Sequence, residues 1–153
     1  MMSDSQHGSY WVQIFNETTW QEFLSAGGNV TGFREKRWAY ISNLMKAGDI
    51  LLCYLSGHSK WIGILEVVSE PFLDLTPIWK QEVFPCRATV RIIAALPMER
   101  AISVHEFKNE VSVLREKTWS LYFINSPTKW KTEDGEIVEA AILASARPGE
   151  RRV

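Results

Sequence analysis

The sequence from Ile50 to Glu70 reads ILLCYLSGHSKWIGILEVVSE. Two apolar runs, Ile50–Leu55 and Trp61–Glu70, are separated by the short polar segment Ser56–Lys60, which contains a glycine. Apolar runs on both sides of such a segment are typical of two strands that are joined by a hairpin loop. We therefore expect an antiparallel strand pair here.

Strand and helix patterns alternate on both sides of this hairpin. Further strands are predicted at Tyr10–Phe15, Arg87–Ala95 and Thr118–Ile124. Helices are predicted at Thr19–Ala26, Trp38–Lys46, Ser103–Leu114 and Thr132–Ala146, and long loops at Asn29–Lys36 and Pro71–Pro85. The first and third of these helices begin with capping-box patterns. Five strands with mainly antiparallel neighbours and flanking helices predict an α+β fold with a small curled sheet or barrel.

The length and composition of the chain fit one globular domain. Its 153 residues are 46% hydrophobic and 23% charged, which is typical of a chain that buries a core. We expect a single domain over residues 10–146, with short tails at residues 1–9 and 147–153. The net charge of -1 excludes the large positive field of a protein that coats DNA without specificity.

Several classes of site are not indicated by the sequence. Cys53 and Cys86 stand alone, without a CxxC pair or a histidine at ligand spacing. Nucleotide-binding, zinc-protease, serine-hydrolase and EF-hand motifs do not occur. Residues 1–12 have no apolar signal-peptide core, and no apolar run is long enough to span a membrane. We therefore expect a cytoplasmic protein without a metal, a cofactor or a membrane contact.

A set of short motifs occurs in a particular order between Tyr10 and Phe123. The motifs are Tyr10-Trp11-Val12, Trp20, Gly32-Phe33 with Arg34-Glu35-Lys36, Lys46-Ala47-Gly48-Asp49, Tyr54, the segment Gly63–Pro71, Asp74, Trp79, Phe84-Pro85, Arg87, and Lys117-Thr118-Trp119-Ser120 with Phe123. Each motif is weakly specific when taken alone. In this combination and order the chain resembles an EVE domain.

The resemblance implies a fold and a function. It implies a PUA-like fold, which is a small mixed β-barrel flanked by helices, in a superfamily that includes the YTH readers of methylated adenine in RNA. EVE domains are regarded as modules that bind a modified nucleobase in DNA or RNA, often beside restriction machinery. The expected partners are therefore nucleic acid carrying a modified base and a separate restriction or modification protein, and the chain itself is not expected to be an enzyme.

Aromatic residues in loops are the main candidates for a base-binding site. The chain has seven Trp, seven Phe and four Tyr. A base that stacks on an aromatic side chain gains about 1 to 3 kcal/mol. Phe33 and Trp79 lie in the two predicted loops, at positions that resemble those of cage aromatics in YTH domains, and we expect them to form walls of a pocket. The alternative is that both fill one end of the barrel as core residues.

Other candidates for the site are less distinct. Asn16 could hydrogen-bond to a base edge or cap the first helix. Tyr54 could form a wall or pack in the core, and Ser120 could reach the pocket from the strand that contains Trp119. Ser56 begins the loop that follows Tyr54 and is a further candidate. The resemblance adds Gly32, Phe84 and Pro85 as neighbours of the expected pocket.

Basic residues beside Phe33 could contact phosphates. Arg34, Lys36 and Arg37 are the candidates, although scattered basic residues are often simply solvated surface. Two other function classes stay open. PUA-like folds include ASCH-type amidohydrolases of acylated nucleosides, and for that activity Thr31 and Lys36 are the candidate catalytic residues. A protein interaction module would instead show an exposed apolar patch.

Overall fold

A computed structural model of the protein describes residues 8–107, 109–115, 117, 119–123 and 125–152. The strands are β1 (Tyr10–Phe15), β2 (Val30–Phe33), β3 (Ile50–Leu55), β4 (Lys60–Val67), β5 (Phe72–Leu73), β6 (Cys86–Ala95), β7 (Ile102–Ser103) and β8 (Thr128–Trp130). The α-helices are α1 (Glu17–Ser25), α2 (Trp38–Leu44) and α3 (Thr132–Arg152). The 3-10 helices are η2 (Glu35–Arg37), η3 (Met98–Arg100), η4 (Val104–Phe107), η5 (Ser112–Arg115) and η6 (Trp119–Phe123).

The strands form one mixed sheet that curls into a half-barrel. Its order is β2-β6-β4-β3-β1-β8, with β5 paired to β6 and β7 paired to β4. Only the β1–β3 pair is parallel among the strands of the described residues. The long strand β6 pairs with β2 through its first residues and with β4 through its later ones, so it carries the sheet around the bend. This arrangement confirms the predicted α+β class.

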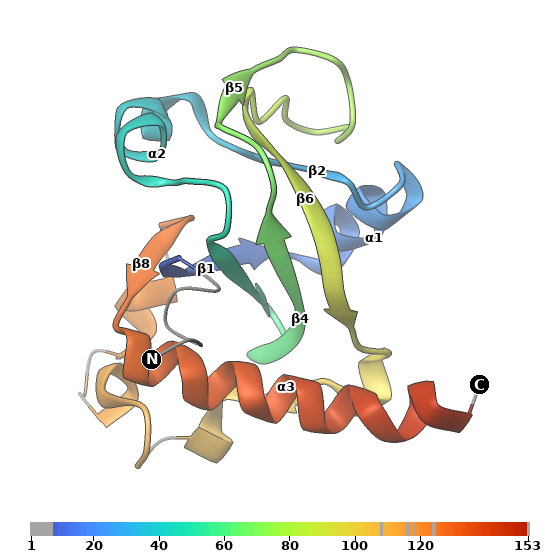
Figure 1. The fold of residues 1–153 in the computed structure, drawn as a ribbon, viewed down its shortest axis with the longest axis vertical. Coiled ribbons are helices and arrows are strands. Elements are labelled where there is room, and N and C mark those ends of the chain that lie inside the picture. The colour runs from blue at the N-terminus through green and yellow to red at the C-terminus, as the bar shows by residue number, and fades with distance from the viewer. Residues whose placement is uncertain (1–7, 108, 116, 118, 124, 153) are drawn as a thin grey trace.

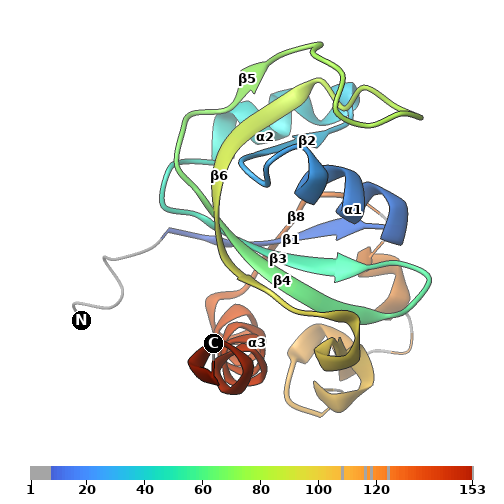
Figure 2. The ribbon, with the colours of Figure 1, turned by 90° about the vertical axis from the view of Figure 1, so that its right-hand side faces the viewer.

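Helices cover the two faces of the sheet. Figure 1 shows α3 running along one side of the sheet, while α1 and α2 lie on the other side. In Figure 2, α3 is seen end-on beside the yellow 3-10 segments, below β3 and β4, and β2, α1 and α2 lie above β1. The curled sheet thus has an upper end, closed by α1, α2, β2 and the loop after β5, and a lower side covered by α3 and the 3-10 segments.

The lower side contains a compact group of rings, which we call the core aromatic cluster (Tyr54, Trp61, Phe123 and Trp130). Tyr54 stacks on Phe123 with ring centroids 4.2 Å apart, and Trp61 meets Trp130 edge-on at 5.6 Å. All four side chains are buried. Trp11 and Val90 are buried as well, as expected for a barrel interior.

Several predicted elements differ from the structure near the N-terminal half. Helix α1 begins at Glu17 rather than at Thr19, because Asn16 and not Thr19 is its N-cap. Residues 29–36 do not form a loop throughout, since Val30–Phe33 is a strand that is paired with β6. A four-residue strand with a central glycine has little intrinsic strand preference, so long-range pairing decides its conformation.

The predictions between residues 98 and 131 were largely wrong. Ser103 does not open one helix that runs to Leu114: its hydroxyl accepts a hydrogen bond from the His105 amide at 3.2 Å at the start of the short 3-10 helix η4, and a second 3-10 helix, η5, follows. The predicted strand at residues 118–124 is instead the 3-10 helix η6 in its described part, while Thr118 and Ile124 lie outside the described residues. Strand β8 was not predicted, and α3 continues beyond Ala146 to Arg152.

Candidate functional site

The upper end of the half-barrel contains a cavity of about 270 Å³. Strands β1 and β2, the start of α1, and the loop after β5 supply most of its lining, and Asn125 and Ser126 close one side. Pockets for drug-sized ligands are usually about 300 to 1,000 Å³. The cavity is therefore suited to a small group rather than to an extended ligand.

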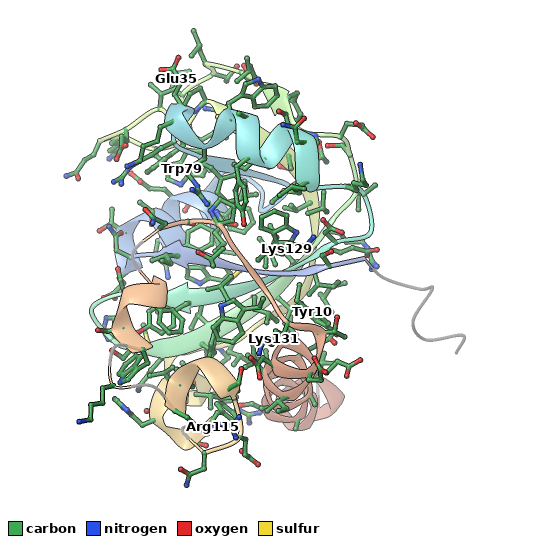
Figure 3. The ribbon with its side chains drawn as sticks, turned by 90° about the vertical axis from the view of Figure 1, so that its left-hand side faces the viewer. Tyr10, Glu35, Trp79, Arg115, Lys129 and Lys131 are labelled. Carbon is green, nitrogen blue, oxygen red and sulfur yellow. The ribbon has the colours of Figure 1, made fainter. Side chains whose placement is uncertain are left out.

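Trp79 forms one wall of this cavity and is held there by several contacts. Its indole N–H donates a hydrogen bond to the carbonyl of Thr19 in α1 at 3.2 Å. Its ring meets Phe84 edge-on at 5.3 Å. In Figure 3, Trp79 lies below helix α2, at the upper end of the molecule. Although it belongs to a loop, Trp79 is only 5% exposed, so its position is fixed by the fold.

Gly32 in β2 allows this wall to approach the sheet closely. A Cβ atom on Gly32 would lie 2.7 Å from the carbonyl oxygen of Phe84 and 2.9 Å from the Trp79 ring. Phe84 has a φ of 49°, a left-handed conformation that is unfavourable for a bulky residue. The loop is thus packed tightly against β2, at the edge of the cavity.

A buried arginine holds the loop in this conformation. The Arg87 guanidinium donates hydrogen bonds to the carbonyls of Phe84 at 3.1 Å and Val83 at 3.0 Å. It also lies 3.6 Å from the carboxylate of Asp74 and 5.6 Å from the centre of the Trp79 ring. Burial lowers the pKa of Arg87, but a guanidinium keeps its charge at any physiological pH. Arg87 therefore fixes the loop that carries Trp79.

Gln13 provides a polar group on the inner side of the cavity. Its side-chain Nε2 donates to the Thr31 hydroxyl at 2.6 Å and lies 3.4 Å from the carbonyl oxygen of Gly32. Gln13 is 2% exposed, and its Oε1 has no hydrogen-bond partner among the described residues. A buried acceptor without a partner costs about 1 to 3 kcal/mol. Such a group is a natural place for a ligand or a water to bind.

Asn16 serves mainly as the cap of α1. Its Oδ1 accepts a hydrogen bond from the Thr19 amide at 2.7 Å, and the Thr19 hydroxyl accepts one from the Asn16 amide at 2.9 Å. Asn16 also lines the cavity, but its acceptor oxygen is already used by the cap. Its side-chain Nδ2 is not used by the cap.

The three basic residues expected at phosphates lie along the cavity, with different partners. Arg34 pairs with Glu82, with Nε 2.8 Å from Oε2, and this hydrogen bond raises the pKa of Arg34. Arg37 donates to the carbonyl of Pro127 at 2.6 Å, and its guanidinium lies 4.4 Å from the centre of the Tyr40 ring. Lys36 is exposed and has no ion-pair partner among the described residues.

The structure brings together some of the expected pocket residues and separates others. Those that line the cavity are Phe33, Trp79, Asn16, Gly32, Ser56 and Phe84. Tyr54 lies in the core aromatic cluster instead, Ser120 is exposed on η6, and Pro85 does not line the cavity. Thr31 is fully buried and bonded to Gln13, so it is not presented as an exposed nucleophile.

Sequence reasoning missed Gln13 altogether. The available signal was a single polar residue in the otherwise apolar strand YWVQIF. In a strand, alternate residues share a face, so Gln13 projects to the same side as the buried Trp11 and Phe15. A polar side chain on the interior face of a strand needs a partner, and this pattern could have marked it as a site residue.

The described part of the chain contains no group of three or more His, Cys, Asp or Glu side chains that could hold a metal ion. Among the helices described, none combines the length and the apolar character that crossing a bilayer requires.

Comparisons with known proteins place this geometry in a known fold. The YTH domain of Mmi1, solved as a complex with RNA, superposes with a TM-score of 0.66, at 14% identity over 95% of this chain and 88% of that chain. A protein of Agrobacterium tumefaciens superposes with a TM-score of 0.60, at 18% identity over 88% of this chain and 93% of that one. These likenesses confirm the predicted PUA-like fold.

The sequence itself also has relatives. A UPF0310 protein of Pyrococcus horikoshii is 26% identical over 88% of this chain and 99% of its own length. A UPF0310 protein of Pyrococcus abyssi is 34% identical over 56% of this chain and 66% of its own length. The family model for the EVE domain matches residues 9–131, which include every strand of the half-barrel and the cavity. The chain therefore belongs to the EVE domain family, as the order of its motifs predicted.

Proposed function

We propose that the protein is a binding module that takes a single modified nucleobase of DNA or RNA into the cavity at the upper end of the half-barrel. The observation that carries this proposal is a small cavity with aromatic walls from Phe33, Trp79 and Phe84 and a buried acceptor on Gln13 without a partner. A base is flat and apolar on its faces and polar at its edge. This combination of walls and polar groups is complementary to it.

The likeness to an RNA-bound YTH domain supports a nucleic-acid ligand. The cost of unstacking a base is a few kcal/mol, and it is lowest where the strand is already single. Stacking on an aromatic wall returns about 1 to 3 kcal/mol. We therefore infer that the protein binds a base in a single-stranded or locally opened segment rather than within an intact duplex.

The modification itself contributes a modest preference. A methyl group that becomes buried against the aromatic walls adds about 0.8 kcal/mol, which is roughly a fourfold change in Kd. The identity of the base contributes more, because a polar group left unpaired costs about 1 to 3 kcal/mol. The protein should thus distinguish one base from another more strongly than a methylated base from its unmethylated form.

The test is a titration with single-stranded DNA and RNA oligonucleotides that carry one 5-methylcytosine, one N6-methyladenine or the unmodified base at the same position. We expect one of these bases to bind best, and Trp79→Leu to weaken its binding about 5- to 150-fold, since the aromatic wall is lost. Trp119→Leu is the matched control, because Trp119 does not line the cavity. Equal weakening by both variants, or no preference among the oligonucleotides, would contradict the proposed function.

A further inference from the structure

The two sides of the cavity differ in charge. On one side lie α1, which contains no Lys or Arg, and the loop after β5. They bring two carboxylates to the lining, Glu22 and Glu82, of which Glu82 is paired with Arg34. On the other side, Lys36 and Arg37 line the cavity. A nucleic-acid strand carries one negative charge per nucleotide, so the two sides are not equivalent as exits for its backbone.

Strand β8 begins at the basic side of the cavity. Asn125 and Ser126 line the cavity, and Pro127 connects them to β8. The Ser126 hydroxyl accepts a hydrogen bond from the Ile14 amide at 3.0 Å, and the Pro127 carbonyl accepts one from Arg37 at 2.6 Å. These contacts fix the start of β8 relative to the cavity.

The register of the sheet places Lys129 of β8 on the face that carries the cavity. Lys129 is paired with Trp11 of β1, and the side chains of directly opposite residues lie on the same face of a sheet. Gln13, two residues after Trp11, shares that face and lines the cavity. Diagonal neighbours such as Gln13 and Lys129 are about 7 to 8 Å apart. Lys129 therefore lies close to the cavity.

Lys131 continues this basic surface away from the cavity. Lys129 and Lys131 are exposed, and Trp130 between them is buried. Neither lysine has an ion-pair partner among the described residues. Two residues of a strand span about 7 Å, which is of the same order as the step between phosphates of an extended single strand. In Figure 3, which looks onto the β8 side of the molecule, the two lysines follow one another below Trp79.

We propose that the strand whose base enters the cavity leaves it over β8, with two of its phosphates on Lys129 and Lys131, and not over α1. This inference rests on the proposed function. Lys36 stands at the start of the route, at the cavity itself. Lysines on an edge strand also discourage pairing with another sheet. If that were their only role, removing them would cause self-association and leave oligonucleotide binding unchanged.

The experiment uses single-stranded oligonucleotides in which the best-bound base carries two further nucleotides on its 5′ side only or on its 3′ side only. A strand has a direction, so only one of the two extensions reaches β8. Wild-type protein should bind that oligonucleotide about 2- to 30-fold more tightly than the other, as expected for two exposed charge pairs. Its slope of log K against log salt should be steeper by about 1.4, equivalent to two phosphate contacts.

The lysine variants test whether β8 is the source of this difference. Replacing Lys129 and Lys131 together by Gln should make the two oligonucleotides bind equally. Lys129→Gln alone should remove the larger part, because the acidic Glu133 follows Lys131 by two residues. Lys80→Gln is the matched control: it removes the same charge from an exposed residue of the groove beside α1, and the difference should stay at its wild-type value.

The outcomes separate this inference from the proposed function. Equal affinities and salt slopes for the two extensions with wild-type protein would overturn the β8 route, and this comparison decides the question even if the double variant self-associates. A difference that survives in the double variant, or that Lys80→Gln abolishes, would overturn it as well, while base binding would stand. A failure of wild-type protein to bind either oligonucleotide would overturn the proposed function itself.

Discussion

The molecule contains two groups of aromatic residues that use their rings differently. In the core aromatic cluster, rings fill space against one another, with centroid separations of 4.2 to 5.9 Å. At the upper end, Trp79, Phe33 and Phe84 leave a cavity beside them. All of these side chains except Phe84 are buried, so burial does not distinguish the two groups.

The two groups differ in the elements that carry their rings and in the polar groups beside them. The core cluster is formed by residues of β3, β4, β8 and η6, which pack on one another. The upper group depends on a loop that is fastened by a buried arginine and packed on a glycine. Close packing is expected of a core, whereas a cavity maintained by such specific contacts is what a binding site requires.

The largest expected effect is on stability, from truncation in the core cluster. Trp61→Ala should lower the free energy of unfolding by about 3 to 5 kcal/mol, because Trp61 is fully buried and its removal leaves a void. That is a large part of the 5 to 15 kcal/mol that stabilises a typical domain. Urea denaturation measures the change, and a loss below about 1 kcal/mol would show that this cluster is not the close-packed core described above.

A smaller effect is expected where the loop packs on β2. Gly32→Ala should cost about 1 to 3 kcal/mol of stability, since the added methyl group overlaps the Phe84 carbonyl and the Trp79 ring. It should also weaken oligonucleotide binding by moving the wall. Gly57→Ala is a useful comparison: its methyl group would meet no neighbouring atom, although its φ of 87° makes that substitution unfavourable by itself. The contrary outcome is that Gly32→Ala leaves both stability and oligonucleotide binding unchanged while Gly57→Ala lowers stability. That result would contradict the account in which the Trp79 wall packs closely on Gly32.

The smallest effect is expected for electrostatics at the rim of the cavity. Arg34 and Arg37 are engaged by Glu82 and by the Pro127 carbonyl, so Lys36 is the basic residue most available to a phosphate. Lys36→Ala should reduce the slope of log K against log salt by about 0.7 for a single strand, equivalent to one phosphate contact. Affinities measured at several salt concentrations give the slope. An unchanged slope would mean that Lys36 contacts no phosphate.

The parts of the fold that could be predicted are those with strong local patterns. The hairpin of β3 and β4 and the long strand β6 follow from apolar runs with clear boundaries. Strands β2 and β8 were missed because each is short and exists through pairing with a distant segment. The 3-10 helix η6 resembles a strand in sequence, but its Phe123 ring packs on Tyr54 and Trp61, and this contact cannot be read locally.

The candidate site could be predicted only in part, for a similar reason. The family motifs indicated Phe33 and Trp79 as neighbours, and the structure places both along one cavity. Tyr54 was considered because it stands just before the loop that begins at Ser56, and Ser120 because it follows Trp119 in a predicted strand and would point to the opposite face. The sequence around Tyr54 does not show that its side chain points to the lower side of the sheet, away from the cavity. Gln13 was missed because its significance depends on having no partner once the sheet has closed.

The division between the two aromatic groups can be tested directly by NMR. The chain has seven tryptophans, so its indole N–H signals can be assigned by single Trp→Phe substitutions. On addition of the oligonucleotide that binds best, the signal of Trp79 should shift strongly, while those of Trp61 and Trp130 in the core cluster should stay in place. A shift of the Trp61 or Trp130 signal with the Trp79 signal unmoved would contradict the assignment of base binding to the upper cavity.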